Sequence, residues 1–125
     1  MKKHKQLLAF TSLILLFLIA GCFSNPVQDD LLKYVNEDLA EIVELEEEVI
    51  AEYESVVGVN YVDDWTTYVH LDEVVIPMYQ DFVTKLEAIR PGTNEVRDVH
   101  EIYIEGVNKQ LNAMMKILIA IERQD

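Results

Sequence analysis

The residues of this chain that could carry chemistry are mainly carboxylates and histidines. Five glutamates recur at spacings of three and four residues: Glu37, Glu41, Glu44, Glu48 and Glu52. That spacing places them on one face of a helix, where like charges repel one another. The face is either a docking surface for a cationic protein or a weak divalent-cation surface, or it is a solvated face that keeps the protein soluble. No segment has the acidic pattern with a central glycine that defines an EF-hand.

Two polar residues lie where the helical patterns call for apolar ones. Asp38 lies four residues before Ile42, at the edge of one apolar stripe, and His100 lies inside another. If the first and third helices run parallel, Asp38 can reach His100. The pair is then a pH-sensitive buried pair or half of a metal site. Alternatively, His100 is a core histidine satisfied by a single hydrogen bond, as buried polar groups usually are.

The residue types needed for catalysis are scarce. Ser24 and Ser55 are the only serines after residue 22. The sequence contains no G-x-S-x-G turn and no glycine-rich phosphate loop. No cluster of cysteine and histidine suits zinc, and the paired Glu-x-x-His motifs of di-iron bundles are missing. We therefore expect a protein that is not an enzyme and that carries no metal and no cofactor.

Aromatic residues gather around one turn. Tyr61 and Trp65 flank the loop that follows Gly58, with Val59, Val62 and Tyr68 close by. Tyrosine and tryptophan dominate binding hot spots, so these side chains are candidate anchors for a partner. The alternative is a hydrophobic plug that seals the end of a helical bundle. Solvent exposure of Trp65 distinguishes the two.

Three amphipathic helices are expected to position these groups. Apolar residues recur every three or four positions in three stretches, about 27–57, 64–89 and 94–122. Gly58 ends the first stretch, and the segment Arg90–Asn94, with Pro91 and Gly92, separates the second from the third. Pro77 falls on the polar side of the second stretch, where we expect a kink rather than a break.

Short turns between long helices force neighbouring helices to run antiparallel. The sequence therefore predicts an all-α fold, an antiparallel three-helix bundle over residues 27–125. In the first helix the expected core stripe includes Val27, Leu31, Val35 and Leu39. The third stripe contains His100. An extended hairpin that dimerises is the alternative architecture.

The first 22 residues have a different character. Lys2, Lys3 and Lys5 precede an apolar run from Leu7 to Ala20, which suits a signal peptide and is short for a membrane span. The run ends in Leu18-Ile19-Ala20-Gly21-Cys22. This segment resembles the lipobox of bacterial lipoproteins. The resemblance implies cleavage after residue 21, a diacylglyceryl thioether on Cys22 and a short tether over residues 22–26. An uncleaved anchor or an ordinary secretory signal is the alternative.

Charge narrows the range of partners. Three of the ten basic residues precede Cys22 and all 23 acidic residues follow it, which leaves a formal charge of −16 after cleavage. Nucleic acid and anionic lipid headgroups would repel such a domain. The resemblance to lipoproteins implies a lipid anchor on the extracytoplasmic face of the cell membrane, and the charge leads us to expect that the domain binds a cationic protein or envelope component. The alternative function is a small-ligand or metal sensor or chaperone with Asp38 and His100 as its internal site.

Overall fold

The computed structural model describes residues 25–124, so the lipobox and Cys22 lie outside the described residues. The first helical segment consists of α2 (Pro26–Lys33), the π-helical turn η1 (Tyr34–Asp38) and α3 (Ala40–Glu54). A short 3-10 turn, η2 (Gly58–Asn60), follows. Gly58 has a φ of +58°, in the left-handed region that favours glycine, and so allows the chain to reverse.

The second segment is also divided by a π-helical turn. It consists of α4 (Asp64–His70), η3 (Leu71–Val75) and α5 (Ile76–Ala88). The third segment is a single helix, α6 (Asn94–Arg123). These bounds lie close to the predicted ones, although α3 ends before the expected residue 57.

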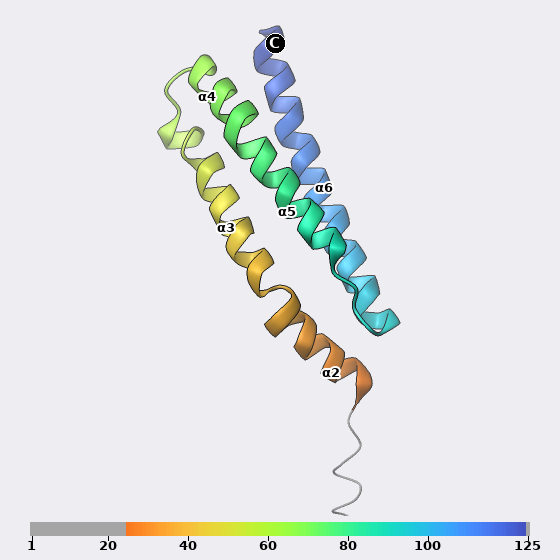
Figure 1. Cartoon of the computed structure of the whole chain (residues 1–125). Coiled ribbons are helices and arrows are strands. Elements are labelled where there is room, and N and C mark those ends of the chain that lie inside the picture. Colours follow the sequence, from red (N-terminus) through yellow and green to blue (C-terminus); the bar gives the residue numbers. More distant parts are fainter. Residues whose placement is uncertain (1–24, 125) are drawn as a thin grey trace, which may run out of the picture.

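The segments form the predicted all-α helical bundle (Figure 1). Consecutive segments run in opposite directions, and α5 packs against both α3 and α6. α2 reaches across to the start of α6. The first described residue lies at the same end as the turn between α5 and α6 (Figure 1). The turn between α3 and α4 lies at the other end, which also holds the C-terminal end of α6 (Figure 1). We call this second end the distal tip.

Side-chain caps fix where the helices begin. The Asn25 carboxamide accepts hydrogen bonds from the first turn of α2, and Pro26 occupies the first position, where a missing N–H has no cost. Asp63 caps α4 by accepting a hydrogen bond from the Thr66 amide at 2.7 Å. Thr93 caps α6 in the same way. The sequence allows Asp63 or Asp64 as the cap of the second helix and Thr93 or Asn94 as the cap of the third, and the structure uses Asp63 and Thr93.

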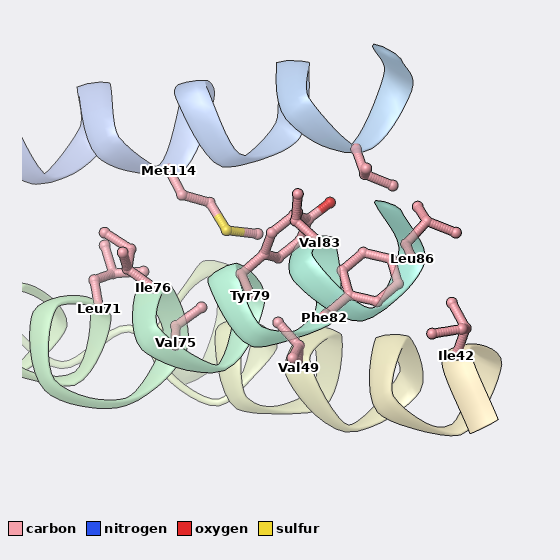
Figure 2. Packing of buried hydrophobic residues seen from close by; sticks show 11 residues of the cluster. Ile42, Val49, Leu71, Val75, Ile76, Tyr79, Phe82, Val83, Leu86 and Met114 are labelled. Atoms are coloured by element: carbon pink, nitrogen blue, oxygen red, sulfur yellow. The ribbon is translucent and has the colours of Figure 1, made fainter. Parts of the chain in front are cut away.

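The core lies between α5 and its two neighbours (Figure 2). Tyr79 and Phe82 are both fully buried, and their rings meet edge to face with centroids 5.2 Å apart. Met114 approaches them from α6, and Val49 from α3 (Figure 2). The second and third stripes thus have the predicted phase. Burial of such side chains supplies most of the free energy that stabilises the bundle.

The predicted core stripe is wrong in α2 and η1. Leu31 and Val35 were expected in the core, but they are 42% and 52% exposed. Tyr34 is buried in their place, at 2% exposed. The Leu39 amide donates to the Tyr34 carbonyl across five residues, which inserts one extra residue into the helix. That insertion changes the phase between α2 and α3, so one continuous stripe cannot serve both.

Pro77 coincides with a change in hydrogen bonding along the second segment, which continues as a helix on both sides. It lies in the first turn of α5, is exposed, and directly follows η3. Proline has no amide hydrogen and its ring crowds the preceding turn, so wider hydrogen bonding on its N-terminal side accommodates it. The apolar side chains Leu71, Val75 and Tyr79 remain buried across the junction.

Asp30 joins the first helix to the third. Its carboxylate accepts hydrogen bonds from the amides of Gly92 at 3.0 Å and Thr93 at 2.7 Å, and from the Thr93 hydroxyl at 2.7 Å. These bonds hold the pKa of Asp30 below its usual value. An anionic side chain at these amides also favours the start of α6 electrostatically. Asp30 therefore fixes α2 against the turn between α5 and α6.

Replacing Asp30 by alanine should loosen this junction and leave the distal tip intact. We expect amide hydrogen exchange at Gly92 and Thr93 to become severalfold faster, because both amides lose their acceptor. Exchange in the middle of α6, around Val107, should not change. Replacing the neighbouring exposed Asp29 by alanine is the matched control, and equal acceleration in both variants would contradict the assignment.

None of the helices within residues 25–124 combines the length and hydrophobicity that a membrane span requires.

Candidate functional site

Only part of the acidic face predicted on the first helix is free of contacts with the rest of the bundle. Glu44 and Glu48 are exposed on α3. Glu41 pairs with Lys85 of α5 at 3.4 Å, and Glu52 contacts the His70 imidazole at 2.8 Å. These two contacts tie the edge of the face to the second segment. Glu37 lies in η1, so the α-helical spacing no longer relates it to the other four.

Glu46 has a different role from the exposed glutamates. It is half-buried on α3, and it accepts a hydrogen bond of 2.6 Å from the hydroxyl of Tyr103 on α6. Burial and this hydrogen bond raise the pKa of Tyr103. Nearby, the Tyr79 hydroxyl donates to the Gln110 side chain of α6. These contacts satisfy polar atoms at the margin of the core.

His100 is buried, as its place in the stripe predicted, but its partner is not Asp38. The Tyr34 hydroxyl lies 2.8 Å from His100 Nδ1, and the two rings meet edge to face. Asp38 instead accepts a hydrogen bond of 2.5 Å from Lys33. The predicted pair is thus wrong, because the extra residue in η1 turns Tyr34 toward α6.

The surroundings of His100 favour its neutral form. The residue is 4% exposed, and within the described chain its Nε2 has no hydrogen-bond partner. Burial, assisted by the nearby Arg90 guanidinium, lowers the pKa of His100, while Glu101 and the Leu86 carbonyl oppose the shift. Burial is the largest of these effects, and it disfavours the charged imidazolium.

The contacts of His70 do not form a nucleophilic triad. His70 Nε2 lies 2.8 Å from Glu52 and 3.4 Å from the Ser55 hydroxyl. A triad uses one imidazole nitrogen for the nucleophile and the other for the carboxylate. Here one nitrogen makes both contacts, and the Ser55 hydroxyl donates to the Glu52 carbonyl. Within residues 25–124, no group of three or more His, Cys, Asp or Glu side chains has the geometry to hold a metal ion.

The aromatic residues of the distal tip are open to solvent. Trp65 is 72% exposed and Tyr61 is 50% exposed. A plug for the end of the bundle would bury its ring, so the structure excludes that interpretation of Trp65. The Trp65 and Tyr68 rings stack with an interplanar angle of 13° and centroids 6.0 Å apart.

A hollow of about 510 Å³ lies beside this stack, between α4 and the C-terminal end of α6. Its lining consists of Asp64, Trp65, Tyr68, Ile121, Glu122 and Gln124. The sequence predicted Trp65 as a binding residue and placed Tyr68 close to it. The i, i+3 spacing of Trp65 and Tyr68 was the available signal for their stacking, whereas the contribution of α6 depends on the packing of distant segments.

The Asp64 carboxylate lies at the edge of this hollow. The Tyr61 hydroxyl donates to Asp64 Oδ1 at 2.8 Å, and this bond raises the pKa of Tyr61. Because the neighbouring Asp63 is used as the cap of α4, Asp64 is the acidic group of this turn that faces the hollow. The distal tip thus combines an exposed aromatic surface with carboxylates.

Comparison of the chain with protein-family models, with curated proteins and with solved structures finds no significant match.

Proposed function

We propose that this chain is a lipid-anchored protein of the extracytoplasmic membrane face, whose acidic helical domain binds a cationic protein or envelope component without catalysing a reaction. Lipid on Cys22 is its attachment to the membrane. The exposed ring of Trp65 at the distal tip is the single observation that carries the binding proposal most strongly. A large exposed aromatic side chain costs solubility, and such residues concentrate at interaction sites.

The position of the tip supports this proposal. Only residues 23–25 separate Cys22 from Pro26, where α2 begins. An anchor there would hold the α2 end of the bundle at the lipid surface and direct the distal tip away from it (Figure 1). α6 has 30 residues, and a helix of that length spans about 45 Å. A partner could therefore reach Trp65 without contacting the bilayer.

Charge supports a cationic partner. The chain carries a formal charge of −13, or −16 without its first 21 residues. Glu44 and Glu48 add an exposed acidic surface on α3, the helix that leads to the distal tip. A field of one sign steers oppositely charged partners and raises their association rate.

Affinity capture from cell-envelope extract tests this proposal. We expect Trp65→Ala to reduce recovery of the captured partner by about tenfold, as loss of a hot-spot aromatic does. The double substitution Glu44→Lys and Glu48→Lys should reduce recovery in a salt-dependent way. Ile102→Ala is the matched control, because Ile102 is 70% exposed but lies toward the opposite end of α6. Equal recovery by all variants would remove both proposed surfaces.

The anchor is tested separately by metabolic labelling with palmitate. The unmodified chain should incorporate label and fractionate with membranes, whereas Cys22→Ser should do neither. Label in the Cys22→Ser variant, or none in the unmodified chain, would refute the anchor without bearing on the distal tip.

A further inference from the structure

The hollow at the distal tip has the chemistry of a cation site. Asp64 and Glu122 are its charged lining residues, and both are exposed. No basic residue lines it. It also lies at the C-terminal end of α6, where the carbonyl groups of the last turn carry partial negative charge. An anionic ligand would be repelled by these carboxylates, and a purely apolar ligand would displace their water without pairing with their charge.

The aromatic surface selects the kind of cation. Tyr68 stacks on one side of Trp65, and the indole is still 72% exposed, so it offers an open ring face and not the box of rings that encloses a quaternary ammonium group. A planar guanidinium can lie flat on an indole ring and still donate two hydrogen bonds to one carboxylate. An ammonium group is compact and strongly hydrated, so it gains less from this arrangement.

The dimensions of the hollow favour a side chain of a larger partner. Its volume of about 510 Å³ is larger than an isolated guanidinium needs, and it lies open at the surface between two helices. A bare metal ion is a poor occupant, because no group of three or more ligating side chains occurs within residues 25–124. The space suits an arginine together with part of the segment that carries it.

We propose that this hollow receives an arginine side chain from a basic segment of the partner protein. The guanidinium stacks on Trp65 and bonds to Asp64, and Glu122 contributes the second negative charge. This inference rests on the proposed function and specifies its partner: a protein segment with an exposed arginine.

Intrinsic fluorescence tests the proposal directly, because Trp65 is the only tryptophan in the chain. The full chain in detergent is titrated with tetra-arginine amide and with tetra-lysine amide, which have equal length and charge. Tetra-arginine should change the Trp65 emission in a saturable way and bind about tenfold more tightly than tetra-lysine. Equal affinities would overturn the proposal, since they would indicate attraction by charge alone.

Variants locate the binding site. Glu122→Gln and Asp64→Asn should each weaken tetra-arginine binding about tenfold, as expected for a charge-assisted hydrogen bond to the ligand. Asn at position 64 can still accept the Tyr61 hydrogen bond, so the local fold is kept. Glu44→Gln removes the same charge from α3 and should change the affinity less than twofold, within the range of a distant surface charge. Equal effects of Glu122→Gln and Glu44→Gln would refute the site.

Calorimetry with Trp65→Ala, which has no tryptophan emission, should show loss of the preference for tetra-arginine. A preference that persists in this variant would overturn the stacking role. If tetra-arginine fails to bind but Trp65→Ala still loses the envelope partner, the arginine inference fails and the proposed function stands. If tetra-arginine binds but no variant loses the envelope partner, the proposed function fails instead.

Discussion

Replacing Phe82 by alanine will destabilise the bundle by about 3–5 kcal/mol, the range for large-to-small changes in a packed core. Phe82 is fully buried and lies edge to face against Tyr79 with centroids 5.2 Å apart. It lies on α5, the helix that contacts both of its neighbours, so the cavity removes contacts at the centre of the fold (Figure 2). Domains of this size are stable by roughly 5–15 kcal/mol, so the loss is a large fraction of the total.

Urea denaturation followed by circular dichroism measures this effect. Ile102→Ala provides the comparison, because the same kind of truncation at a 70% exposed position should change the free energy of unfolding by less than about 0.5 kcal/mol. Similar losses in the two variants would mean that α5 is not the centre of the core. A change in the denaturant dependence would instead indicate altered compactness of the unfolded state.

The pattern of apolar residues was sufficient to predict the three helical segments. Residues such as Val75, Tyr79 and Phe82 recur at helical spacing, and the breaks between segments contain Gly58 and Pro91. Helix ends follow local rules, so the cap residues could be limited to neighbouring pairs. Pro77 likewise marked where the second segment departs from regular α-helix, because its effect depends on covalent geometry.

The extra residue in η1 could not be predicted in the same way. No proline or glycine occurs in Tyr34–Asp38, so nothing local marks the π-helical turn. The turn is compatible with burial of Tyr34 against His100, a contact between residues 66 positions apart. A one-residue shift rotates a helix by about 100°, which is why Leu31, Val35 and the Asp38–His100 pair were wrongly placed.

At the distal tip, too, some features could be predicted from the local sequence and others depend on how distant segments pack. Trp65 was identified from residue type and its position beside a turn. Its exposure and the lining by Ile121 and Glu122 depend on how the end of α6 meets α4, which a periodic pattern does not specify. Asp30 is a parallel case, since a carboxylate suited to the first turn of its own helix instead binds amides at the start of α6.

Acidification should destabilise the bundle through His100. Burial lowers the pKa of this imidazole below its ordinary value of 6.5. The unfolded chain therefore takes up a proton at a higher pH than the folded chain does. Stability is fully present above about pH 6.5, falls as the pH drops below that value, and stops falling once the folded imidazole is also protonated. Arg90 reinforces this direction, and Glu101 opposes it.

Variants of the Tyr34–His100 pair distinguish the effect of His100 protonation on stability from the effect of carboxylate protonation. His100→Leu should flatten the pH dependence of the unfolding free energy between about pH 5 and 7, where model carboxylates no longer titrate strongly. At neutral pH, Tyr34→Phe should cost about 1–3 kcal/mol, because the buried Nδ1 atom loses its partner. The double variant leaves neither polar group unpaired, so its loss should be smaller than the sum of the two single losses. Additive losses, or a pH dependence that His100→Leu leaves unchanged, would show that this pair does not make the stability of the bundle sensitive to acid.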